Sequence, residues 1–274
     1  MKPMVIYHAD CTDGFGAAFA FWKCFGDRFE YYPARHDKPA PDVTDREVFI
    51  VDFSYSYEQT VEMAKQARKV VILDHHKTAQ ESLGQLLKEK VVSGEFDMNR
   101  SGAVMTWDYL YGKKSDRPFF ISYIQDRDLW RWQLPNSREI SAWLSSFPQE
   151  FEVWDELSTT CFDDAAREGA AISRRHNQIV KDLVKTAFKI NVGGYSVFAV
   201  NAPRHFASDV GHELSKMRQF GVTYHDSDFG QVYSLRSSNG FDVSEVAKMY
   251  GGGGHAAAAG FGLKHGESLE GAQA

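Results

Sequence analysis

Short apolar runs alternate with segments of helical spacing along the first part of this chain. The apolar runs, which we predict to be strands, lie at 3–8, 29–35, 47–54 and 69–76. Segments 13–26 and 56–67 between them have helical character, and Ser56 is a good N-cap for the second helix. Because strands and helices alternate in this way in βαβ units, the sequence predicts an α/β domain with a mostly parallel sheet flanked by helices.

The pattern continues with helical segments and then changes character near residue 188. We predict a helix at 101–112, which begins after a serine cap and ends at a glycine, and a long helix at 163–187. Between them, the segment 117–132 is apolar and aromatic until two aspartates appear.

The C-terminal part has the pattern of a second, smaller α/β domain. Two strand-like runs within 188–202 flank a Gly-Gly pair, which indicates a hairpin. A helix at 208–217, a strand at 229–238 and a helix from 242 follow, and then the run GGGGHAAAAG. We therefore predict a domain at 1–162, a linker helix at 163–187, a C-terminal domain at 188–265 and a tail at 266–274.

Composition narrows the class of partner. The net charge is −6, so the chain lacks the basic signature of a protein that binds long duplex nucleic acid. Three cysteines without paired spacing indicate a reducing compartment. We find no signal peptide and no apolar run of about 20 residues, so we expect a cytoplasmic protein with no membrane partner.

Metal-ligand residue types follow several of the predicted strands. They are His8, Asp10, Asp13, Asp52, Asp74, His75 and His76, and Asp126 closes an apolar segment that could reach the same edge. In open parallel sheets, ligands bind beyond the carboxyl ends of the strands. A carboxylate-rich set with imidazoles favours Mn²⁺. Because several carboxylates repel one another without cations between them, we expect two divalent ions, an arrangement used in phosphoryl transfer.

Each of these residues has a simpler explanation when it is taken alone. Asp52 could be a turn or cap residue, His8 a structural histidine, and Asp10 and Asp13 could cap the following helix. Asp128 is expected to make a local hydrogen bond. The coincidence of four clusters at the expected edge of the sheet favours the metal site.

Four motifs resemble those of the DHH phosphoesterase superfamily. They are HADCTDG near the N-terminus, VDFS, DHH after a strand, and IQDRDLW. The segment RSSNGFDVSEVAKMYGGGGHAAAAGF resembles the C-terminal domain associated with DHH proteins. The short two-domain layout is similar to the oligoribonuclease and RecJ-like group. The first motif departs from many relatives: Asp10 and Asp13 follow His8 by two and five residues rather than four and six. Asp13 is therefore the safer ligand, and Asp10 is either a ligand or a partner of one.

The resemblance implies roles for the N-terminal residues. The metal ligands would be His8, Asp10, Asp13, Asp52, His75 and Asp126, with Asp52 bridging two ions, most readily Mn²⁺, with Mg²⁺ or Co²⁺ as alternatives. Asp74 would orient its neighbours. His76 would protonate the leaving oxygen, so the resemblance implies Asp52 and His76 as the catalytic residues.

The C-terminal domain would bind substrate. Arg236 can hold a phosphate with two hydrogen bonds, and the backbone at Gly252, Gly253 and Gly254 can approach an anion closely, with His255 as a further donor. A flexible loop with a structural histidine is the alternative. The active site is expected in the cleft between the domains.

The function that the resemblance implies is metal-dependent hydrolysis of short oligonucleotides or linear dinucleotides to nucleoside monophosphates. Alternatives are a phosphomonoesterase for pAp-like nucleotides or polyphosphate, a cyclic-dinucleotide phosphodiesterase, and a non-catalytic nucleotide-binding protein on the same fold. The acidic net charge favours short substrates, since polymers need many cationic contacts. A homodimer is left open.

Overall fold

The chain consists of two compact units, each with its own sheet. The computed structural model describes residues 1–36 and 38–270. The units are Met1–Arg174 and Arg175 onwards, and the division between them falls within helix α8 (Phe162–Lys185). It therefore lies inside the segment that the sequence predicts as a linker helix, 163–187.

The sheet of the first unit is wholly parallel. Its strands are β1 (Met4–His8), β2 (Glu30–Ala34), β3 (Glu47–Val51), β4 (Lys69–Asp74) and β5 (Ser93–Phe96), in the order β2-β1-β3-β4-β5. In register, Ile6 pairs with Ile50, which pairs with Ile72. The parallel sheet is confirmed. In this strand order, the chain adds β2 on one side of β1 and then adds β3, β4 and β5 on the other side. The boundary between β1 and β3 is therefore a topological switch point, which is where ligands bind in doubly wound sheets.

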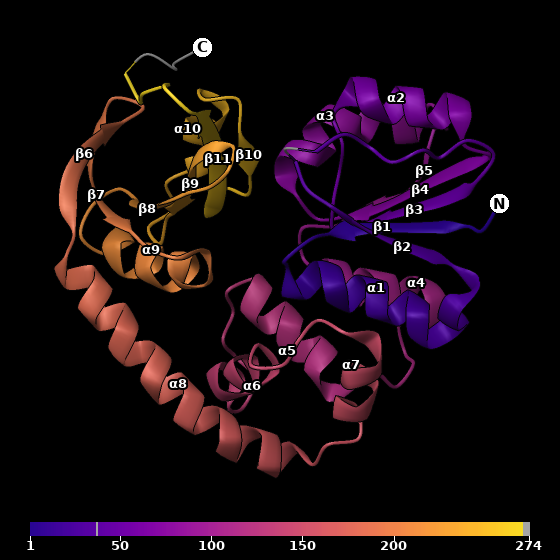
Figure 1. Cartoon of the computed structure of the whole chain (residues 1–274), viewed down its shortest axis with the longest axis horizontal. Coiled ribbons are helices and arrows are strands. Elements are labelled where there is room, and N and C mark those ends of the chain that lie inside the picture. The colour runs from indigo at the N-terminus through magenta and orange to yellow at the C-terminus, as the bar shows by residue number, and fades with distance from the viewer. Residues whose placement is uncertain (37, 271–274) are drawn as a thin grey trace. The chain divides into compact units, whose positions relative to one another are not determined.

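Helices cover both faces of this sheet (Figure 1). They are α1 (Thr12–Phe25), α2 (Tyr57–Gln66), α3 (Lys77–Lys88) and α4 (Gly102–Tyr111). One set of alternate strand residues, including Ile50, packs towards α2 and α3 with Leu83. The other set, including Val51, packs towards α1 and α4 with Phe21 and Met105. The core therefore fixes the strands between two helical layers, as period-two alternation requires.

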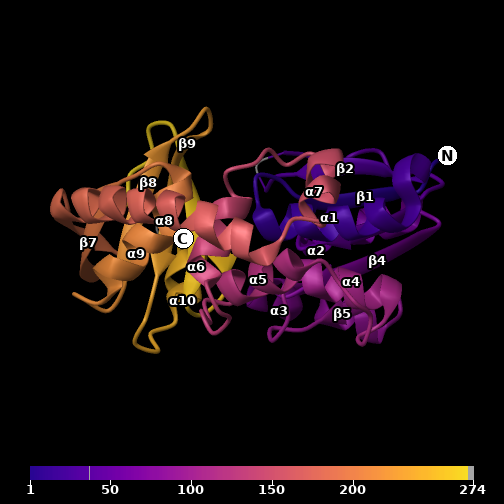
Figure 2. The ribbon, with the colours of Figure 1, turned by 90° about the horizontal axis from the view of Figure 1, so that it is seen from below.

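Three more helices form a further layer against α1 and α4, on the side away from the sheet (Figure 1), and Figure 2 views the first unit from that side. They are α5 (Phe119–Asp128), α6 (Ser137–Leu144) and α7 (Phe151–Leu157). Aromatic residues join them to α1, with Phe19, Phe120 and Trp154 in one buried cluster. The apolar segment 117–132 is thus largely helical, and its aspartates lie in the last turn of α5.

The predicted caps of two helices are present. Ser56 and Gln59 form a reciprocal capping box at the start of α2. The Ser101 side chain accepts a hydrogen bond from the Val104 backbone N–H at the start of α4, and this helix ends at Gly112. The sequence missed α3, α6, α7 and the short strand β5, whose residues Ser93–Phe96 are mostly exposed and carry no alternating apolar pattern.

The second unit has a mixed six-stranded sheet. Its strands are β6 (Phe188–Val192), β7 (Tyr195–Asn201), β8 (Gly221–Asp226), β9 (Gly230–Arg236), β10 (Gly253–Gly254) and β11 (Ala258–Lys264), in the order β10-β11-β9-β8-β7-β6. Only the β7–β8 pair among these is parallel. The predicted hairpin of β6 and β7 is confirmed, with Gly193 and Gly194 in its turn.

Helices lie on both faces of the second sheet as well. Helix α10 (Val243–Lys248) contributes to one core with Tyr233 and Phe261. Helix α9 (Ala207–Ser215) lies on the other face, where Val210 packs against Val180 from the second half of α8. Within residues 1–36 and 38–270, no helix combines the length and apolar character needed to cross a membrane.

Candidate metal centre

Asp52 lies at the centre of a cluster of acids and imidazoles. It follows β3 directly, has a left-handed backbone (φ 54°), and is 1% exposed. Its Oδ1 lies 3.1 Å from His75 Nε2, whereas its Oδ2 lies 3.8 Å from His8 Nδ1 and 3.4 Å from Cys11 Sγ. The two oxygens of one carboxylate therefore face two different sets of donors.

The first donor set consists of Asp13, His75 and Asp128. His75 Nε2 lies 3.5 Å from Asp13 Oδ2 and 3.4 Å from Asp128 Oδ2. The Asp13 carboxylate also accepts hydrogen bonds from the backbone N–H groups of Gly102 (2.6 Å) and Ala103 (2.9 Å). These are the first residues of α4, so the positive end of this helix holds the carboxylate in place.

The second donor set consists of His8, Cys11 and Asp52. His8 ends β1, and Cys11 is the residue that precedes α1. Their ligand atoms and an Asp52 oxygen all lie within 4.8 Å of one another. Asp52 also contacts His75 of the first set through its other oxygen, so this one carboxylate faces both donor sets.

The electrostatics of the cluster suit a cation. Burial, together with the carboxylates of Asp52 and Asp128, raises the pKa of Asp13 well above its usual value. Asp128 is an exposed residue, but desolvation of its carboxyl group beside the cluster raises its pKa as well, and the Asp52 carboxylate adds to this effect. Burial opposes ionisation of Asp52, but its contacts with His75 and His8 outweigh this and hold its pKa well below the usual range. Divalent cations would relieve the repulsion among these carboxylates, so the residues fit a metal site.

Cys11 is a thiol in this environment. Burial and the nearby Asp52 carboxylate raise its pKa well above the usual value, and its S–H donates to Asp52 Oδ2.

Asp10, which precedes Cys11 in the sequence, is placed differently from the other predicted ligands. Asp10 forms an ion pair with Arg35 at 2.5 Å, is half-exposed, and belongs to neither donor set. Of the two descriptions left open for Asp10, the structure does not support a direct ligand.

Asp74 and His76 form a pair beside the cluster. Asp74 is fully buried at the end of β4, and its Oδ2 accepts a hydrogen bond from Ser54 Oγ at 2.6 Å. Its Oδ1 lies 2.6 Å from His76 Nδ1 and accepts from the His75 backbone N–H at 2.7 Å. Burial works against protonation of His76, but Asp74 outweighs it and raises the His76 pKa.

The structure separates the two aspartates of IQDRDLW, and the assignment of Asp126 as a ligand needs correction. Asp126 accepts hydrogen bonds from the backbone N–H groups of Gln133 (3.0 Å) and Leu134 (3.2 Å) and from Ser137 Oγ (2.5 Å). It therefore fixes the connection between α5 and α6. Asp128, for which we expected a local hydrogen bond, lies beside His75. Residues two apart on a helix point in widely different directions, which the motif alone does not resolve.

In the second unit, Arg236 ends β9 and is held by neighbours. Its Nη2 donates to Ser208 Oγ in α9 at 2.9 Å, and its Nη1 donates to the Leu235 carbonyl at 2.9 Å. A hollow of about 240 Å³ opens next to it along the chain. The residues that line this hollow are Ser237, Ser238, Gly240, Phe241, Ala256 and Ala257.

The glycine run is part of a tight hairpin. Gly253 and Gly254 form β10 and pair with β11, and the His255 backbone N–H donates to the Ala258 carbonyl at 2.8 Å. A Cβ atom at Gly252 would lie 2.1 Å from the Gly260 carbonyl oxygen, and Gly254 has φ 137°. The strand pairing thus requires glycine at these positions whether or not an anion binds here.

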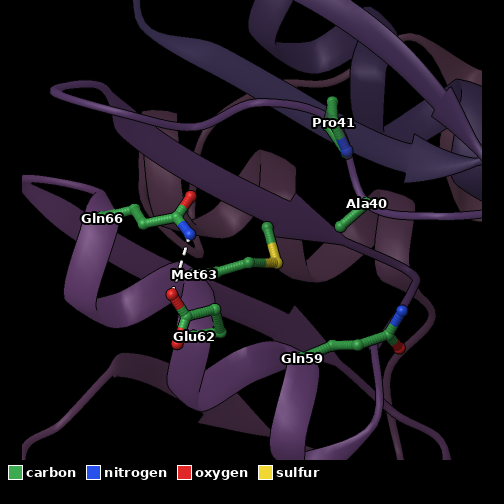
Figure 3. Close-up of a pocket in the computed structure, with 6 residues that line it drawn as sticks. All are labelled: Ala40, Pro41, Gln59, Glu62, Met63 and Gln66. Carbon is green, nitrogen blue, oxygen red and sulfur yellow. Dashed lines mark hydrogen bonds between the residues drawn. The ribbon is translucent and has the colours of Figure 1, made fainter.

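Figure 3 shows a different hollow, of about 190 Å³, between α2 and the chain before β3. Its lining residues are Ala40, Pro41, Gln59, Glu62, Met63 and Gln66. The Gln66 side chain donates to Glu62 Oε1 at 2.9 Å within it. None of these residues belongs to the donor sets, so this hollow is separate from the candidate metal centre.

The contrast between Asp128 and Asp126 gives a prediction. Asp128→Ala should weaken Mn²⁺ binding by at least the 10–100-fold that is typical of lost partners in metal sites, with little loss of stability. Asp126→Ala should leave Mn²⁺ affinity nearly unchanged and lower the free energy of unfolding. The loss arises because buried hydrogen-bond donors are left unsatisfied, at a cost of about 1–3 kcal/mol each. Calorimetric titration with Mn²⁺ and urea unfolding of both variants would measure this. Equal metal affinities in the two variants would contradict the assignment of Asp128.

Known proteins resemble both units. Residues 213–274 match the family model described as the DHHA1 domain. The uncharacterized protein R106 of Acanthamoeba polyphaga mimivirus is 31% identical over 287 residues, which cover 94% of this chain and 66% of that protein. The chain therefore spans somewhat less than two thirds of the length of this curated relative.

Several solved structures share the fold at low sequence identity. An exopolyphosphatase-related protein from Bacteroides fragilis is 14% identical, with 98% of this chain and 89% of that chain covered and a TM-score of 0.55. RecJ from Thermus thermophilus, in complex with Mn²⁺, is 13% identical, with 96% and 50% covered and a TM-score of 0.52. A pGpG-specific phosphodiesterase from Vibrio cholerae is 13% identical, with 96% and 94% covered and a TM-score of 0.50. The DHHA1 match over residues 213–274 confirms the resemblance for the C-terminal part of the chain, which carries a DHHA1 domain, and the structural neighbours share the fold of nearly the whole chain.

Proposed function

We propose that the protein is a metal-dependent phosphodiesterase that hydrolyses short oligonucleotides or linear dinucleotides to nucleoside monophosphates. The observation that carries this proposal is the position of Asp52, whose two carboxylate oxygens face two donor sets. The residues that would hold two divalent ions are His8, Asp13, Asp52, His75 and Asp128. Mn²⁺ is the first choice because the donors are mostly carboxylates, and the RecJ neighbour was solved with Mn²⁺.

The neighbouring side chains support a hydrolytic reaction. Bound divalent ions supply Lewis-acid polarisation of a phosphate at such a centre. His76 would donate a proton to the leaving oxygen, since Asp74 raises the pKa of this imidazole and so favours its protonated form. Asp74 engages Nδ1 of His76, so proton delivery falls to Nε2.

Arg236 is our candidate for binding a substrate phosphate. Its guanidinium is fixed by Ser208 and by the Leu235 carbonyl, so little side-chain entropy would be lost on binding. A guanidinium held in this way can form paired, charge-assisted hydrogen bonds to a phosphate. Gly252 to His255 remain candidates for further contacts, although strand pairing already explains the glycines.

The choice of short substrates rests on charge. A net charge of −6 disfavours long polyanions, which need many cationic contacts. The pGpG-specific phosphodiesterase among the structural neighbours supports a linear dinucleotide. The exopolyphosphatase-related neighbour keeps a phosphomonoesterase or polyphosphatase as the second candidate.

The proposal is tested by product analysis with Mn²⁺ on a panel of linear dinucleotides, longer oligonucleotides, cyclic dinucleotides, pAp and polyphosphate. We expect nucleoside monophosphates from linear dinucleotides at the highest kcat/KM, with Asp52→Asn as the inactive control. Orthophosphate released from pAp or polyphosphate alone would overturn the proposal in favour of a phosphomonoesterase. Binding of nucleotides without turnover would indicate a non-catalytic protein.

The role of His76 predicts a defect in chemistry rather than in metal binding. His76→Gln should lower kcat by about 10²–10⁴-fold, the usual contribution of a general acid. A p-nitrophenyl phosphodiester needs little protonation of its leaving group, so it should largely escape the defect. His75→Gln is the matched variant and should lose metal. If His76→Gln loses Mn²⁺ to the same degree, His76 is a ligand and not the acid.

The role of Arg236 predicts a defect in substrate binding. Arg236→Ala should weaken dinucleotide binding by roughly 10–150-fold, which corresponds to about 1.5–3 kcal/mol for a charged hydrogen bond. Mn²⁺ affinity should stay unchanged. Arg218→Ala is a suitable control, because Arg218 is exposed in the same unit. An unaltered KM and kcat for Arg236→Ala would refute the assignment.

A further inference from the structure

The second donor set lacks the carboxylate that the sequence offered for it. Asp10 and Asp13 are the carboxylates that the first motif offers beside His8, but Asp10 forms an ion pair with Arg35 and Asp13 lies beside His75 in the first donor set. This leaves His8 Nδ1 and Asp52 Oδ2, 3.8 Å apart, as the nitrogen and oxygen donors of the set. Two donors are few for a site that holds an ion firmly, since catalytic zinc sites use three protein ligands.

Cys11 supplies the missing donor. Its Sγ lies 3.4 Å from the same Asp52 oxygen that faces His8, and all three ligand atoms lie within 4.8 Å of one another. The sulfur comes from the residue that precedes α1, a helix of 14 residues.

We propose that Cys11 is a ligand of the second metal ion, together with His8 and Asp52. This inference rests on the proposed metal centre and changes its chemistry. Coordination replaces the S–H proton, which passes to solvent. A thiolate beside an imidazole and a carboxylate favours Zn²⁺ or Co²⁺ over Mn²⁺ and Mg²⁺. The two sites would then differ: a carboxylate-rich site around Asp13 and Asp128, and a softer site around Cys11.

Other roles for Cys11 fit less well. A nucleophilic thiol needs a base, whereas the hydrogen-bond acceptor of Cys11 is the carboxylate of Asp52, which two imidazoles already engage. A disulfide with Cys24 is excluded by distance, because thirteen residues along α1 correspond to about 20 Å. Cys24 therefore serves as a matched control, and exposed Cys161 as a second one.

The test is the absorption spectrum of the 274-residue chain titrated with Co²⁺. A cobalt–thiolate bond gives a charge-transfer band in the near ultraviolet, separate from the visible d–d bands of bound Co²⁺. We expect this band in the wild type, in Cys24→Ser and in Cys161→Ser, and its loss in Cys11→Ser with d–d bands retained. Zn²⁺ affinity of Cys11→Ser should fall by at least about 10–100-fold, while Mn²⁺ affinity should change much less.

The outcomes separate this inference from the proposed function. Visible d–d bands without a charge-transfer band in the wild type would overturn the role of Cys11 and leave the metal centre standing. Absence of all Co²⁺ bands would remove the metal centre and the inference together.

A measurement on the wild type covers the case in which Cys11→Ser does not fold. Iodoacetamide labelling, mapped by mass spectrometry, should be slowed by Zn²⁺ at Cys11 and unchanged at Cys161. Equal labelling of Cys11 with and without Zn²⁺ would overturn the proposal.

Discussion

The burial of several like charges at one edge of a parallel sheet is the constraint on which the first unit depends. Asp13, Asp52 and Asp74 are each at most 1% exposed. A buried carboxylate costs several kcal/mol unless it is paired and hydrogen-bonded. The surrounding fold must therefore supply a donor or a positive charge for each of these three groups.

The fold meets this need with backbone ends and imidazoles. Asp13 lies against the N-terminus of α4, Asp52 lies between two histidines, and Asp74 binds Ser54 and His76. The left-handed backbone at Asp52 is a conformation that aspartate adopts more readily than most residues. These contacts do not remove the repulsion between the carboxylates of Asp13, Asp52 and Asp128. A bound divalent cation would offset the repulsion that remains.

The position of the cluster follows from topology. With the strand order β2-β1-β3-β4-β5, the carboxyl ends of β1, β3 and β4 are adjacent, and they carry His8, Asp52 and Asp74. Helix α5, which belongs to the layer outside α1 and α4, delivers Asp128 to the same place from its last turn. The site thus depends on the outer helical layer as well as on the sheet.

The sequence by itself determined the parallel α/β sheet, the caps of α2 and α4, the hairpin at Gly193, the DHHA1 resemblance, and the gathering of acids and histidines after the strands. Each of these has a local cause: apolar periodicity, cap chemistry or turn chemistry. The sequence pattern did not predict strand β11. Its Ala and Gly residues have little strand preference, so pairing with β9 decides its conformation.

Only the tertiary structure decided which residues of each motif reach the centre. In IQDRDLW, the turn of α5 sends Asp126 to the backbone before α6 and Asp128 to His75. In HADCTDG, the left-handed backbone at Asp10 and its ion pair with Arg35 turn that acid away, while the start of α1 brings Cys11 to Asp52. Spacing along a chain restricts which side chains can meet, but their directions depend on backbone dihedrals and on partners distant in the sequence.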